Sequence, residues 1–159
     1  MTTFQNQDNL LQAADAVGRA YIIELTNQLI SADKKASGDL INSLDYEVIE
    51  VLGNILIRVK AESYLKNVDQ GRKKGNFPPV GAIEKWVKTK RIQFKDKKGK
   101  FTTYKSTAFA VARGIQKNGI KPTKVLDKAK KNILSTMKEI LLEATKKDIK
   151  EYINKILTE

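Results

Sequence analysis

The pattern of apolar and polar positions begins with a helical repeat between Asn9 and Ala32. Apolar side chains return every three or four residues over this stretch, at Leu10, Ala14, Val17, Tyr21, Leu25 and Leu29. That spacing is typical of one face of an amphipathic helix. Gly38 comes shortly after the last of them, and a glycine in this place commonly ends a helix. The pattern therefore predicts one long helix near the start of the chain.

A β-hairpin is predicted next, because two largely apolar runs, 44–52 and 55–61, are separated by Gly53-Asn54. A two-residue connection of this kind suits a tight primed turn. The resulting register puts four pairs on the face toward the core: Leu52 with Ile55, Glu50 with Ile57, Val48 with Val59, and Tyr46 with Ala61. On the opposite face, Glu47 is expected across from Lys60 as a cross-strand ion pair.

Three further helices are predicted in the second half, over about 80–91, 103–117 and 123–157. The last carries apolar residues at helical spacing to near its end and would be ~50 Å long. A helix of that length exceeds the diameter of so small a domain. Its end should project from the body and pack on another chain, or the helix should break near Lys146-Lys147.

The stretches between these helices are predicted to be loops. Residues 64–68 form a short piece that leads into 69–79, where two Gly and two Pro residues predict a surface loop. Residues 95–100 are almost all charged, which indicates a solvated turn or a mobile loop tip. Trp86 falls on the apolar side of its helix, so we expect it in the core first and at an interface second.

Together these elements predict an α+β fold: a long N-terminal helix, an antiparallel β-hairpin or small sheet, and then helices that include a long C-terminal one. A chain of 159 residues is enough for one domain with a core. We expect a single α+β core domain over 1–130 and a C-terminal helical extension of the same domain over 131–159.

Candidate chemistry is limited by what the chain lacks. It contains no cysteine and no histidine, which removes thiolate chemistry, disulfides and the commonest general base and metal ligand. The glycine-rich motifs that bind nucleotide phosphates are missing, and we expect no carboxylate cluster of the kind that holds Mg²⁺. We therefore expect no enzyme activity, no cofactor, no metal and no small-molecule substrate.

The net charge of +12 is concentrated in the middle of the chain. Residues 1–62 contain 5 Lys/Arg and 9 Asp/Glu, residues 63–131 contain 20 and 4, and residues 132–159 contain 5 of each. This asymmetry predicts a basic surface that meets an acidic partner, although solubility alone is a simpler explanation. The candidate binding residues are Arg72, Lys73, Lys74, Lys95, Lys97, Lys98 and Lys100, with Phe77 beside them as an interface residue.

Membrane insertion and secretion are not expected. No stretch approaches the ~20 apolar residues that cross a bilayer. The first eight residues lack the basic and apolar parts of a secretory signal. We expect the chain to be made in a cytoplasm and to stay there until it assembles, with no membrane partner.

Several short motifs follow one another between residues 36 and 130. Residues 37–43, Ser-Gly-Asp-Leu-Ile-Asn-Ser, come before the hairpin, residues 64–71, Tyr-Leu-Lys-Asn-Val-Asp-Gln-Gly, come after it, and Pro122 lies at the start of the last helix. Their order resembles the tail-completion or head–tail joining proteins of tailed bacteriophages. Two features depart from that pattern. The stretch from the Trp86 helix to residue 100 is a longer middle insertion, and the C-terminal helix runs on past Ala129.

The resemblance implies an α+β virion subunit, without a cofactor, in a ring of six or twelve copies in the neck, collar or tail-completion layer. Such a subunit would be assembled in the cytoplasm of the bacterial host. Its partners would be copies of itself, the portal or adaptor, and tail proteins, with non-specific DNA contact in addition. The acidic first third and the basic middle supply two unlike patches for head-to-tail contacts. Ile149, Ile153 and Ile156 are the expected interface residues of the last helix. The alternative is a small basic protein that binds DNA non-specifically.

Overall fold

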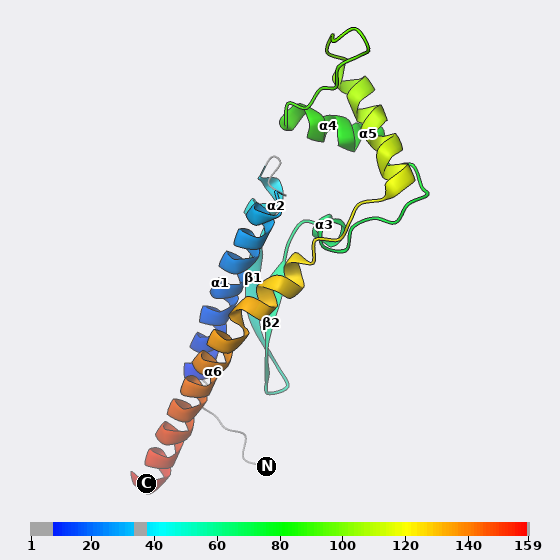
Figure 1. Ribbon diagram of the computed structural model, residues 1–159. Helices are drawn as coiled ribbons and strands as arrows, with labels where there is room; N and C mark the ends of the chain where they lie inside the picture. Colours follow the sequence, from blue (N-terminus) through cyan, green and yellow to red (C-terminus); the bar gives the residue numbers. More distant parts are fainter. Residues whose placement is uncertain (1–7, 34–37, 159) are drawn as a thin grey trace.

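Two long helices run side by side in opposite directions along most of the molecule (Figure 1). They are α1, Asp8–Ser31, and α6, Val125–Thr158. The computed structural model describes residues 8–33 and 38–158, so part of the predicted helix stop before Gly38 lies outside the described residues. Both helices lie where the apolar repeats predicted them. Because α6 continues through all of its 34 residues, the alternative of a break near Lys146-Lys147 is wrong.

The predicted β-hairpin is present as a two-stranded antiparallel sheet of β1, Asp45–Val51, and β2, Asn54–Lys60. Its turn is formed by Leu52 and Gly53, one residue earlier than predicted. Both residues have positive φ, 51° and 74°, as a primed turn requires. The side-chain amide of Asn54 then donates to the carbonyl groups at the turn instead of forming part of it.

This turn moves the register by two residues. The observed pairs on the core-facing side are Glu50 with Ile55, Val48 with Ile57, and Tyr46 with Val59, so the predicted pairs are wrong. A shift of two keeps every side chain on its predicted face, whereas a shift of one would have reversed them all. Glu47 still forms its ion pair with Lys60, and a second with Arg58 at 2.8 Å.

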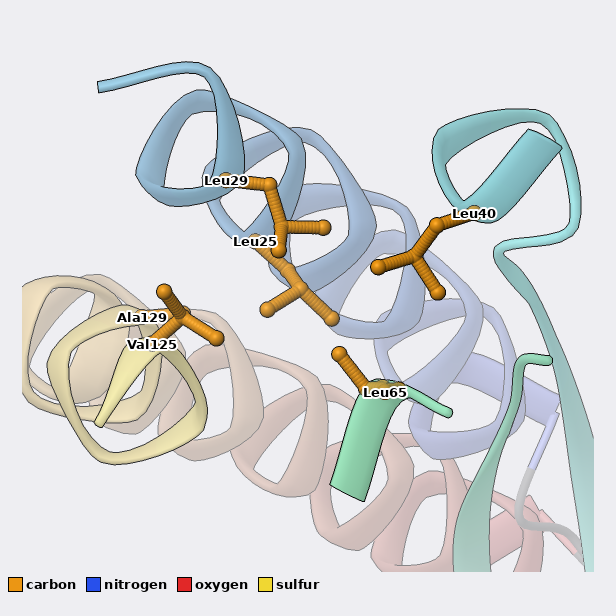
Figure 2. Close-up of a cluster of buried hydrophobic side chains, with 6 residues drawn as sticks. All are labelled: Leu25, Leu29, Leu40, Leu65, Val125 and Ala129. Atoms are coloured by element: carbon orange, nitrogen blue, oxygen red, sulfur yellow. The ribbon is translucent and has the colours of Figure 1, made fainter. Parts of the chain in front are cut away.

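The main hydrophobic core lies where the C-terminal end of α1 meets the N-terminal end of α6. Two short helices close it: α2, Asp39–Asn42, and α3, Leu65–Gln70, which replaces the short piece predicted at 64–68. Figure 2 shows six buried side chains from these four helices converging on one another, Leu25, Leu29, Leu40, Leu65, Val125 and Ala129. Each buried leucine of this kind contributes roughly 1.5–3 kcal/mol.

A second helical lobe lies beyond the end of the helix pair (Figure 1). It consists of α4, Val80–Thr89, and α5, Tyr104–Asn118, which confirm the predicted helices over 80–91 and 103–117. The Thr103 hydroxyl caps α5 by accepting from the Ser106 N–H at 3.1 Å. An ion pair of 3.0 Å between Lys90 and Asp33 ties the lobe to the end of α1. The α+β architecture is therefore a helix pair with a hairpin, plus this lobe.

Candidate interaction surfaces

Two chain segments cross between the helix pair and the lobe, and each carries a glycine at the crossing. Gly71 and Gly119 have φ values of 71° and 73°. A Cβ on Gly71 would lie 2.2 Å from the carbonyl oxygen of Ile120, and one on Gly119 would lie 2.4 Å from that of Arg72. Arg72 and Ile120 exchange backbone hydrogen bonds of 2.9 and 2.8 Å here. Since only glycine fits, Gly71 of the 64–71 motif has a structural role.

Asp69, from the same motif, caps the first turn of α6. Its Oδ1 accepts from the Leu126 N–H at 3.0 Å. Its carbonyl oxygen accepts from the N–H groups of Thr123 and Lys124, both at 3.1 Å. The Thr123 hydroxyl donates to the carbonyl oxygen of Val68 at 2.7 Å. These bonds hold α3 against the start of α6 and satisfy N–H groups that a helix otherwise leaves free.

The seven predicted basic residues lie beside the two ends of α5. Residues 72–74 lie at its C-terminal end, where the Gly75 N–H donates to the Gln116 carbonyl oxygen at 2.8 Å. Residues 95–100 lie at its N-terminal end, next to the capping residue Thr103. A helix of 15 residues spans ~22 Å. The structure therefore divides the predicted basic surface into two groups.

Residues 95–100 form a solvated turn, the first of the two predicted forms. The Asp96 carboxylate accepts from the backbone N–H groups of Lys98 and Lys100 at 2.8 and 2.9 Å. The side-chain ammonium of Lys95 lies 5.1 Å from the ring centroid of Phe101, a cation–π contact. The turn thus presents its lysines to solvent from a fixed backbone.

Phe77 lies between the two basic groups, against α5. Its ring centroid is 5.4 Å from that of Phe109, and the Arg113 guanidinium lies 5.3 Å from the Phe109 centroid. Phe77 and Phe109 are 40% and 45% exposed. A half-exposed aromatic pair with a cation beside it can stack on a flat partner group. Phe109 and Arg113 were not among the predicted site residues; their i, i+4 spacing is the only signal that the sequence offers.

A short run of carboxylates does occur, at Asp45, Glu47 and Glu50 of β1, and carboxylate oxygens are the ligands that Mg²⁺ prefers. In the structure Glu47 is engaged by Lys60 and Arg58, and these bonds, the one with Lys60 first, lower the pKa of its carboxyl. Glu50 lies on the other face of the strand. Across residues 8–33 and 38–158, no group of three or more Asp, Glu, His or Cys is arranged to hold a metal ion.

An apolar hollow of about 550 Å³ lies where α3, α4 and α5 meet. Its apolar walls are Tyr64, Val68, Ala82, Ile83, Trp86, Val111, Ile115 and Ile120. Trp86 is 41% exposed, and Tyr64 and Ile120 are each 40% exposed. Trp86 is therefore a wall of the hollow and not a core residue. The sequence indicated the apolar face of this helix but not that it would stay uncovered.

The C-terminal part of α6 has a second apolar face. Its inner face meets α1, where Ala144 and Asp148 are each only 7% exposed. On the opposite face, four apolar residues separated by seven, four and three positions are 44–56% exposed: Leu142, Ile149, Ile153 and Ile156. This spacing places them in one stripe. We call these four residues the tail stripe; it contains all three isoleucines predicted as interface residues.

Asp148 is the point where α6 supports α1. Its carboxylate accepts from the backbone N–H groups of Asn9 and Leu10 at 3.2 and 3.0 Å, and from the Asn9 side-chain amide at 2.8 Å. The first turn of a helix has N–H groups without a partner inside the helix. Asp148 satisfies two of these for α1, and its negative charge suits the positive end of the helix dipole.

The chain exposes far more surface than a compact monomer of its size. Its accessible surface is 11677 Å², whereas a folded monomer of 17.9 kDa exposes about 8,000 Å². The twelve residues outside the described ranges would add about 1,900 Å² at the value for a fully unfolded chain. About 1,700 Å² remains in excess. Among the described residues, seventeen large apolar side chains are exposed and thirteen apolar ones are buried, six of these alanines.

Comparison with family models, with curated proteins and with solved structures finds no match to this chain. The resemblance of residues 36–130 to phage head–tail joining proteins therefore stays a prediction. Among the described residues, none of the helices is both long and apolar enough to cross a membrane.

Proposed function

We propose that the chain is a non-enzymatic structural subunit that assembles with copies of itself into a ring at the head–tail junction of a tailed bacteriophage. The observation that carries the proposal is the excess accessible surface of a single chain. Each subunit of a ring buries two patches, and a standard interface takes about 800 Å² from each partner. Two such patches amount to about 1,600 Å², close to the excess of about 1,700 Å².

The motif order over residues 36–130 supports the phage part of the proposal. Gly71 and Asp69 of the second motif hold α3, the crossing segments and the start of α6 in place. Motif residues that hold elements in place are what a structural, non-enzymatic subunit requires. The charge distribution also suits contacts between unlike patches, because the acidic residues gather in 1–62 and the basic ones in 63–131.

Two measurements test the two parts of the proposal. Native mass spectrometry of the purified chain over a range of concentrations should detect a closed oligomer, and a monomer at every concentration would contradict assembly. Proteomic analysis of phage particles purified from cells that carry the gene should detect the chain in the particles. Its absence from particles, with the oligomer present, would overturn the virion assignment alone.

Non-specific DNA binding is the second candidate, favoured by the net charge of +12 and the two basic groups flanking α5. Binding through six to ten phosphate contacts falls about 10³–10⁵-fold between 50 and 200 mM salt. Fluorescence anisotropy with a random duplex at these two salt concentrations distinguishes the candidates. A structural subunit should assemble at both concentrations and without DNA, whereas a DNA-binding protein should show tight binding at low salt and no DNA-free oligomer.

A further inference from the structure

The tail stripe of α6 starts at Leu142 and is continuous from Ile149. The same face of the helix carries Lys131, Ser135 and Lys138 in the preceding turns, all exposed to water. From Leu142 onward this face is mainly apolar, with Leu142, Ile149, Ile153 and Ile156, and the exposed polar residues Thr145 and Lys146 lie between the first two. A helix in contact with water on this side would keep polar residues to its end, so the change marks the point at which a partner should begin to cover α6.

The apolar hollow between α3, α4 and α5 is the second uncovered apolar surface. It lies in the region of the lobe, whereas the C-terminal end of α6 lies at the other end of the elongated molecule (Figure 1). The tail stripe of a chain is therefore too distant to fill the hollow of the same chain. One copy offers two unlike surfaces at opposite ends, which is the arrangement that head-to-tail assembly requires.

We infer that subunits join head to tail, with the C-terminal end of α6 from one copy seated in the apolar hollow of the next. This inference rests on the proposed ring function and names its contact. Ile149, Ile153 and Ile156 have i, i+4 and i+7 spacing, the set of anchors by which an amphipathic helix lies in an apolar groove. The half-exposed rings of Trp86 and Tyr64 supply the walls.

Mixing two full-length variants tests the inference. Ile153→Glu should disable the tail stripe and Trp86→Glu the hollow, so each variant alone should be monomeric in native mass spectra. A 1:1 mixture retains one intact tail stripe and one intact hollow, and should give a heterodimer. Ser135→Glu, on the same face of α6 but before the stripe, is the matched control and should assemble as the wild type does. Circular dichroism checks that each variant is folded.

If either glutamate variant fails to fold, disulfide trapping still tests the contact between α6 and the hollow. The chain contains no cysteine, so any disulfide reports only introduced residues. Under mild oxidation Ile153→Cys mixed with Trp86→Cys should give a covalent dimer, and Ser135→Cys with Trp86→Cys should not. Two results would contradict the seating of α6 in the hollow without contradicting assembly. One is an equal yield of covalent dimer in both mixtures. The other is no covalent dimer from Ile153→Cys with Trp86→Cys although the wild type forms its oligomer. A monomeric wild type would instead remove the proposed function.

Discussion

At the scale of single residues, Gly18 lies at a close approach between α1 and β1 that leaves no room for a Cβ. A Cβ at this position would lie 2.3 Å from the Tyr46 ring, which packs over the glycine and donates from its hydroxyl to Asp15 at 2.8 Å. Gly18→Ala gains about 1 kcal/mol of helix propensity, but overpacking costs about 1–3 kcal/mol. We expect a net fall in the free energy of unfolding, measured by urea denaturation. Gly114→Ala on α5, where a Cβ meets open space, should be neutral or stabilising.

Tyr21 should make the free energy of unfolding depend on pH in the alkaline range. Its hydroxyl donates to the carbonyl oxygen of Leu126 at 3.3 Å, and burial, followed by the charges of Asp69 and Asp127, raises the pKa of Tyr21 above its usual 10.0. The folded protein therefore holds this proton more tightly than the unfolded chain. The contribution is complete below pH 10 and is lost as pH rises through the folded pKa. Tyr21→Phe should make unfolding free energy less sensitive to pH above about 10, and an unchanged pH profile would contradict this.

At the scale of the elements, α6 has two roles that the sequence could not distinguish. Asp148 caps the start of α1, and the residues beyond Glu151 carry part of the tail stripe. Truncation after Glu151 removes Ile153 and Ile156 but keeps Asp148 and the Glu151 contact with Asn9. Truncation after Thr145 also removes Asp148, the cap of α1. We expect the first truncation to remain as stable as the full chain at low protein concentration, where both are monomers, and the second to lose about 0.5–2 kcal/mol, the usual cost of a lost cap. Thermal unfolding followed by circular dichroism compares them, with Asp148→Ala as the point variant that should reproduce the second.

The elements that sequence patterning predicted best are those whose side-chain period is long and uninterrupted. α1, α4, α5 and α6 lie close to their predicted bounds. In the hairpin, the local sequence pattern was not sufficient to predict the strand register. Gly-Asn is the better turn dipeptide by preference, yet Leu52 takes a positive φ so that Gly53 can be the second turn residue.

At the scale of the whole molecule, sequence patterning did not predict how the elements would be spread in space. The charge asymmetry and the isoleucines near the end of α6 were visible in the chain. The hollow was not, because it depends on α3 being placed near α4 and α5 by the glycine crossing at Gly71 and Gly119. The basic residues likewise looked like one group along the chain but lie beside both ends of α5.

The excess surface of the single chain leads to a prediction about its stability as a function of concentration. A partner that binds only the folded form stabilises it by mass action, so the midpoint of thermal unfolding rises with protein concentration. We expect this rise for the wild type in differential scanning calorimetry over a hundredfold range of concentration. Ile153→Glu should unfold at the midpoint of the dilute wild type at every concentration, because it retains the core around Leu25 and Leu29 and loses only the contact between copies. A wild-type midpoint independent of concentration would mean that the exposed apolar surface is stable without a copy to cover it.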